Sequence, residues 1–176
     1  MLSNGLEAKV GTLGSKYEFF HEWKRLKESD AGRVELETML RGICEKKTFL
    51  DLLENFILYD HSGGRTTKIL ARNHQYLGVN EAVSAYENRK LKDGRLGVFW
   101  HTQGSGKSYS MVFLAQKIRR KFAGSPTIVV LTDRDELNRQ ISDTFENCGL
   151  LGKTKASQFI ASSGTDLVKK LLYPCR

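Results

Sequence analysis

The sequence predicts an α/β fold in which a parallel sheet follows a mainly helical joining segment. Residues 127–131, Thr-Ile-Val-Val-Leu, are apolar and largely β-branched, as in a strand that is buried on both faces. Residues 95–131 run in order through a short apolar segment, a glycine-rich loop, a helical pattern and that buried strand. This order implies parallel strands that are joined by a right-handed crossover.

Length and composition agree with a globular domain. The chain has 176 residues, of which 40% are hydrophobic and 27% are charged. No apolar run approaches the ~20 residues of a membrane span, and the N-terminus lacks the apolar stretch of a signal peptide. We therefore expect a cytoplasmic protein with no membrane partner. The odd set of cysteines, Cys44, Cys148 and Cys175, lacks Cys-x-x-Cys spacing, which predicts free thiols.

Residues 1–62 form the predicted joining segment. Residues 6–13 alternate between apolar and polar side chains, as a half-buried strand does. A Ser-x-x-Glu capping box at residues 15–18 predicts the start of a helix that carries Trp23. Apolar residues recur at helical spacing over 34–43 and 49–57, which predicts two small amphipathic helices.

Residues 63–176 form the second predicted segment, and the two glycines at 63 and 64 favour a linker at the boundary. Besides the strands at 95–100 and 127–131, its predicted elements are a strand at 66–70 and helices at 72–90, 111–121, 135–145 and within 157–172.

The positive charge of the chain is concentrated in its middle. The net charge is +8, and residues 65–134 alone hold 13 basic and 4 acidic side chains. A basic segment of this kind attracts nucleotides or the phosphate backbone of nucleic acids. The alternative is a solvated surface rich in lysine and arginine. The motifs within the segment decide between the two.

Residues 101–108, His-Thr-Gln-Gly-Ser-Gly-Lys-Ser, carry the strongest chemical signal. Glycines permit positive φ and let a phosphate approach the backbone, and the N-terminus of the following helix favours an anion. Lys107 would reach the β and γ phosphates of ATP, and the Ser108 hydroxyl would bind Mg²⁺. The alternative is a glycine-rich turn whose lysine is merely solvated. The predicted nucleotide-binding residues of this loop are Thr102, Gln103, Gly104, Ser105, Gly106, Lys107 and Ser108.

Five stretches of the chain resemble the restriction (R, HsdR) subunit of type I restriction–modification enzymes. Residues 97–108 resemble its motif I, and residues 126–134 are similar to its motif Ia. Residues 71–76 resemble its upstream adenine-reading, Q-like motif. Residues 5–13 and 39–43 are similar to stretches that join its nuclease to its motor, so the resemblance covers almost the whole chain.

The resemblance implies a fold, an activity and partners. The fold would be an incomplete RecA-like domain of helicase superfamily 2 over residues 63–176, following the joining segment at 1–62. The parent protein would be a site-specific deoxyribonuclease that uses ATP and Mg²⁺ to translocate double-stranded DNA before cleavage. Its partners would be the methyltransferase (M) and specificity (S) subunits.

The resemblance also implies roles for single residues. Lys107 and Ser108 would carry the triphosphate and magnesium roles. Gln75 would read the adenine edge with Arg72 nearby. The stretch that would approach the DNA backbone consists of Thr132, Asp133 and Arg134, with Arg134 as the phosphate contact. His101 stands where the strict phosphate-loop pattern has glycine, which helicase-like motors tolerate. A structural role for His101 is favoured over a metal-binding or catalytic one.

Catalytic carboxylates are missing from the sequence. No Asp-Glu-x-His/Asp motif II follows the second predicted strand, and the pair at 135–136 is typical of a helix N-terminus. The Glu-x-Lys spacings at 7–9 and 45–47 lack a preceding acidic partner and suggest surface charge instead of a nuclease site. We therefore expect an internal fragment of the subunit that is not catalytically competent alone. The alternative is a stand-alone, non-hydrolysing nucleotide- or DNA-binding remnant, whereas the two motif blocks disfavour a kinase.

Overall fold

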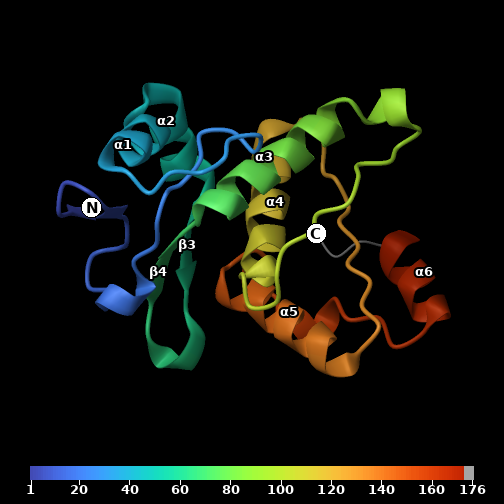
Figure 1. The fold of residues 1–176 in the computed structure, drawn as a ribbon. Coiled ribbons are helices and arrows are strands. Elements are labelled where there is room, and N and C mark those ends of the chain that lie inside the picture. Colours follow the sequence, from blue (N-terminus) through green and yellow to red (C-terminus); the bar gives the residue numbers. More distant parts are fainter. Residues whose placement is uncertain (173–176) are drawn as a thin grey trace.

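The computed structural model describes residues 1–172, which form a mixed α/β structure dominated by helices (Figure 1). The strands are β1 (Leu2–Ser3), β2 (Ala8–Lys9), β3 (Ile57–Asp60) and β4 (Thr67–Leu70). The α-helices are α1 (Leu36–Cys44), α2 (Lys46–Asn55), α3 (Asn73–Glu87), α4 (Lys107–Lys121), α5 (Asp135–Asn147) and α6 (Gly164–Leu172). The helices predicted near these positions are confirmed with shifted ends, and α6 covers only the second half of its predicted range.

A β-hairpin occupies the place of the predicted linker. β3 and β4 pair antiparallel from Ile57 opposite Leu70 to Asp60 opposite Thr67. The strand β3 escaped prediction because its residues continue the apolar spacing of the preceding helix. The two linker glycines, Gly63 and Gly64, have φ of +61° and +72° and lie in the turn of the hairpin. The boundary predicted at 62 and 63 thus falls within one hairpin.

The expected parallel sheet is absent from residues 1–172, where both sheets are two-stranded and antiparallel. Residues 95–100 and 127–131 run as chain without strand pairing, and Val98 and Leu131 are 95% and 92% exposed. Two short parallel strands offer few hydrogen bonds to each other, and a small isolated sheet is marginal in water. The predictions of strands at 95–100 and 127–131 are therefore wrong for this structure.

The predicted helix after the capping box is also wrong. Only a single 3₁₀ turn forms there, at Tyr17–Phe19, and the chain then continues irregularly. Asn73, at the start of α3, accepts hydrogen bonds from the backbone N–H groups of residues 24 and 25 and donates one to the carbonyl of residue 25. These bonds satisfy the backbone without a helix. They also hold Trp23 in the core, where it is almost completely buried.

One hydrophobic core spans both predicted segments. Phe56 lies at its centre, with ring centroids 4.7 Å from Tyr76 of α3 and 5.6 Å from Phe113 of α4. The Trp23 ring packs 5.4 Å from Tyr76 on the other side. Figure 1 shows the hairpin on one side of α4 and α6 on the other. Residues 1–62 therefore pack directly on the helix that follows the glycine-rich loop.

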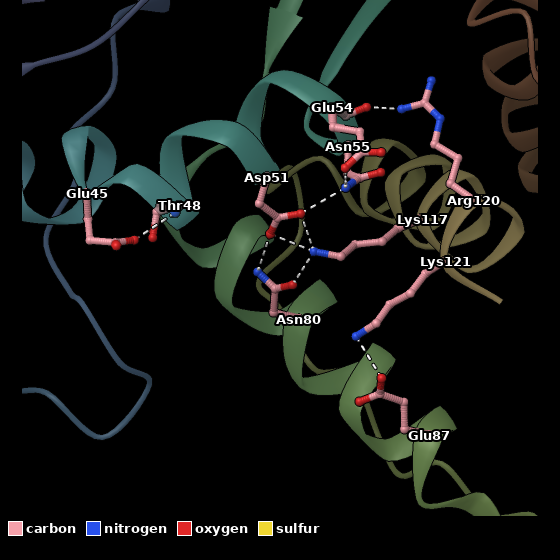
Figure 2. Close-up of polar contacts among 10 residues, drawn as sticks. All are labelled: Glu45, Thr48, Asp51, Glu54, Asn55, Asn80, Glu87, Lys117, Arg120 and Lys121. Atoms are coloured by element: carbon pink, nitrogen blue, oxygen red, sulfur yellow. Dashed lines mark hydrogen bonds and ion pairs between the residues drawn. The ribbon is translucent and has the colours of Figure 1, made fainter.

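A buried ion pair also connects residues 1–62 to α4 (Figure 2). The Lys117 ammonium on α4 lies 2.5 and 2.6 Å from the two carboxylate oxygens of Asp51 on α2, and 2.6 Å from Oδ1 of Asn80 on α3. Burial lowers the pKa of Lys117, and the Asp51 carboxylate opposes that shift. Lys121, one turn further along α4, forms an exposed pair with Glu87 at 2.7 Å.

Two absences concern the described residues only. No helix within 1–172 is long and apolar enough to cross a membrane. Over the same range, no group of three or more histidine, cysteine, aspartate or glutamate side chains is arranged to hold a metal ion. Cys44 and Cys148 are free thiols as predicted, and Cys175 lies outside the described residues.

Candidate functional site

The glycine-rich loop folds as a tight turn that leads directly into α4. Gly104 and Gly106 have φ of +76° and +83°, the left-handed conformation that favours glycine. Gly106 caps the helix, which starts at Lys107. The first N–H groups of a helix have no acceptor within the helix, so the start of α4 can receive an anion.

Lys107 folds back across the loop. Its ammonium donates to the carbonyl of His101 at 2.6 Å and to the carbonyl of Thr102 at 3.1 Å. The side chain is exposed and therefore accessible to a ligand. Ser108 follows in the first turn of α4 and is half-buried. The ammonium thus contacts two neutral carbonyl acceptors at the start of the loop, and phosphate oxygens could replace them.

Helix α3 braces the loop from its other side through Gln75. The buried amide donates from Nε2 to the carbonyl of Gly106 at 2.9 Å, and its Oε1 accepts from the backbone N–H of Arg72 at 2.9 Å. A Cβ at position 106 would lie 2.8 Å from that Nε2. The structure therefore brings Gln75 and the loop together. Reading of adenine by Gln75 stays a prediction, because both polar atoms of the amide already have partners here.

His74 contributes a second brace that sequence reasoning missed. Its Nε2 lies 3.1 Å from the carbonyl of Ser105, and its ring meets His101 edge to face with centroids 4.7 Å apart. The hydroxyl of Ser105 is buried and has no hydrogen-bond partner among the described residues. An orphaned hydroxyl inside the loop fits a site that receives polar ligand atoms. No local signal identified His74, because the carbonyl that it contacts lies 31 residues away in sequence.

Tyr109 ties the first turn of α4 to the hairpin. Its hydroxyl donates to the carboxylate of Asp60 at 2.6 Å. Burial raises the pKa of Tyr109 well above its usual value, and the bond to Asp60 raises it further. The loop is therefore bonded to α3, and the helix turn that follows it is bonded to β3.

The predicted DNA-contacting residues lie apart from this arrangement. Asp133 and Arg134 are exposed where residues 127–134 lead into α5, and Thr132 before them is half-buried. Arg134 lies 3.7 Å from the neighbouring Asp133 carboxylate, and the structure has no hydrogen bond or ion pair between them and the loop within its described part. The pair at 135–136 occupies the first turn of α5, as predicted for helix N-terminal charge.

Comparisons with known proteins give a consistent family assignment. The SWI2/SNF2 ATPase family profile matches residues 74–174. The type I restriction enzyme HindI endonuclease subunit of Haemophilus influenzae is 38% identical to this chain. The match covers 97% of this chain and 16% of the subunit's own length. The putative type I restriction enzyme MjaIXP endonuclease subunit of Methanocaldococcus jannaschii is 30% identical over 97% of this chain and 18% of its own length. The chain thus spans less than a fifth of these relatives, and no solved structure matches it.

Proposed function

The chain belongs to the SWI2/SNF2 ATPase family and is a relative of type I restriction endonuclease subunits, and from this premise we propose that residues 101–108 bind ATP and Mg²⁺. The observation that carries the proposal is the loop itself. It has two left-handed glycines, it leads into a helix N-terminus, and the Lys107 ammonium contacts the carbonyls of its first two residues. Each of these features favours a polyanion.

The loop residues would divide the work of binding. The backbone N–H groups from Gly104 to Ser108 would donate to phosphate oxygens, and Lys107 would exchange the two loop carbonyls for the β and γ phosphates. The Ser108 hydroxyl would hold Mg²⁺, which neutralises phosphate charge when bound. Gln75 would keep the second glycine in place and offer its remaining N–H to adenine, with Arg72 beside it.

The proposal extends to a role in the parent protein. We infer that residues 63–176 are the first part of an ATP-driven DNA motor within the restriction subunit, and that residues 1–62 join it to a nuclease. The DNA backbone would meet Thr132, Asp133 and Arg134 at the start of α5. Double-stranded DNA and the M and S subunits of a type I complex would be the partners. The homology to endonuclease subunits supports this role.

The 176-residue chain alone is expected to bind nucleotide without hydrolysing it. A motor needs a carboxylate pair for Mg²⁺ and water activation, and no motif II occurs within residues 1–176. This absence also favours a second candidate, a non-hydrolysing nucleotide- or DNA-binding remnant. Steady ATP hydrolysis by the chain that is lost in Lys107→Ala would contradict the expected absence of hydrolysis. It would also exclude the non-hydrolysing remnant.

Titration calorimetry of the full chain with ATP and Mg²⁺ tests the binding proposal. A charge-assisted hydrogen bond contributes about 1.5–3 kcal/mol, so Lys107→Ala should weaken binding by roughly ten- to a hundredfold. Lys92→Ala is the matched control, because Lys92 is an exposed lysine of the same basic segment outside the loop. Equal affinities for the wild type and Lys107→Ala would overturn the proposal.

A further inference from the structure

Two imidazoles, one beside the loop and one at its first position, have no assigned part in the binding of phosphate or metal proposed above. His74 comes from the first turn of α3, and His101 opens the loop at the position where the strict pattern has glycine. Their rings meet edge to face at 4.7 Å, and His101 also packs against Phe99 at 4.4 Å. The pair therefore connects α3 to the segment that enters the loop.

One hydrogen bond of His74 fixes which of its ring nitrogens carries the hydrogen. A carbonyl oxygen only accepts, so the contact between Nε2 and Ser105 places a hydrogen on Nε2. In the neutral ring the second nitrogen, Nδ1, then has no hydrogen and can accept one. Protonation of His74 would thus leave its bond to the loop intact while adding a positive charge beside it.

His101 lies in the same loop, and its environment favours the neutral ring. Its Nδ1 is buried and has no hydrogen-bond partner within residues 1–172. Burial lowers the pKa of His101, His74 and Lys107 lower it further, and Glu28 opposes them. In the absence of a ligand, both the burial and the positive neighbours resist a proton on His101.

Arg72, at the start of α3, is a further cation close to His74 and His21. Burial, followed by Arg72 and His74, lowers the pKa of His21 to about 4, so His21 itself is neutral near pH 7. Glu28 is the acidic group that acts against them at His101. The surroundings of the pair are therefore predominantly positive.

A bound triphosphate would reverse this balance, because opposite charge favours the protonated form of an imidazole. We infer that loading of the loop with a nucleoside triphosphate is coupled to uptake of a proton by the His74–His101 pair. The inference rests on the proposed nucleotide site and adds its regulation by pH. By linkage, affinity must rise as pH falls through the interval in which the loaded pair holds more protons than the empty one.

Titration calorimetry of the full chain with MgATP in two buffers of different ionisation enthalpy measures this uptake directly. We expect about half a proton to be taken up at pH 7, and affinity to rise roughly three- to tenfold between pH 8 and pH 6. His74→Gln keeps a donor for the Ser105 carbonyl but cannot titrate, and His101→Gly restores the strict loop pattern. Both variants should lose the pair's share of the uptake.

His61→Gln is the matched control, since His61 lies in the hairpin turn, where it contacts Thr66 and not the loop. Subtracting the proton uptake of a variant from that of the wild type at one pH removes the contribution of protons exchanged by ATP itself. A second readout needs no variant: at constant pH, saturation with inorganic triphosphate should move the nitrogen NMR signals of the two imidazoles toward those of the protonated ring, while the signals of His61 stay unchanged.

The outcomes separate the two proposals. If the wild type does not bind MgATP, or if Lys107→Ala binds it equally well, the nucleotide site itself fails and the coupling with it. If the wild type binds but the proton uptake persists in both His74→Gln and His101→Gly, or if triphosphate leaves the nitrogen NMR signals of the two imidazoles unchanged, the coupling is overturned while the nucleotide site stands.

Discussion

Gly104 and Gly106 share a left-handed backbone but differ in their surroundings. A Cβ at position 104 meets nothing within 4 Å, whereas at position 106 it lies 2.8 Å from the Gln75 amide. Left-handed backbone costs a residue with a Cβ about 1–2 kcal/mol. We predict that Gly104→Ala loses about that much of the free energy of unfolding and that Gly106→Ala loses more. Urea denaturation measures both, and equal losses would show that the contact with Gln75 does not matter.

His21 should make the stability of the chain depend on acid. Burial, followed by Arg72 and His74, lowers its pKa to about 4 from 6.5 in the unfolded chain. Between these values the unfolded state binds more protons, so stability is lost as pH falls from 6.5 towards 4, by up to about 3 kcal/mol. His21→Gln should flatten this part of the profile. Parallel profiles of the free energy of unfolding for the two proteins would refute the assignment.

Single residues were predictable where their role is local. Gly104, Gly106 and Lys107 lie within one short segment, so its turn and the following helix could be predicted from adjacent residues. Asn73 and His74 act on chain that lies 31 to 49 residues away in sequence, and nothing near them signals that contact. Side chains that serve distant backbone groups therefore escaped the sequence.

Helices α2, α3 and α4 meet at Lys117, whose side chain is 8% exposed (Figure 2). Removing one partner of a buried ion pair costs about 3–5 kcal/mol because the other charge stays buried, and partial exposure of Asp51 reduces that cost. We expect Lys117→Met to lose about 2–4 kcal/mol of the free energy of unfolding by urea denaturation.

The same helix offers a matched control for this substitution. Lys121→Met breaks the exposed pair with Glu87 and should cost less than about 1 kcal/mol. Replacing both buried partners, Lys117→Met with Asp51→Leu, should recover much of the loss, because no lone charge then remains. Similar losses in the free energy of unfolding for Lys117→Met and Lys121→Met would mean that the buried pair stabilises the chain no more than the exposed pair does.

Whole elements were predictable where their pattern is periodic. The apolar spacing that predicted α1, α2, α3 and α5 comes from helix faces that are buried against the core in this structure. Strands depend on partners instead. β3 was missed because its partner β4 lies across a turn, and residues 127–131 were expected in a sheet that the described residues do not form.

At the scale of the whole molecule, the charge distribution predicts salt-sensitive binding to duplex DNA. Residues 65–134 carry most of the basic excess, and the phosphate backbone responds to such charge through release of counterions. We expect log affinity to fall linearly with log salt concentration, measured by fluorescence anisotropy. Arg134→Ala should reduce the slope by about one unit, and exposed Lys153→Ala, outside the segment, should not. An affinity that stays constant between about 50 and about 200 mM salt would refute electrostatic binding.

The exposed segment at 127–131 has a consequence for chains that meet one another. It joins high β propensity to the absence of charge, and its backbone hydrogen bonds are not used in strand pairing within residues 1–172. Segments of this kind stack into cross-β fibrils when identical copies collide. Pro126 before it and the charges of Asp133 and Arg134 after it act as gatekeepers against such growth. These flanking residues therefore contribute, beside the stability of the core, to keeping copies of the chain apart in concentrated solution.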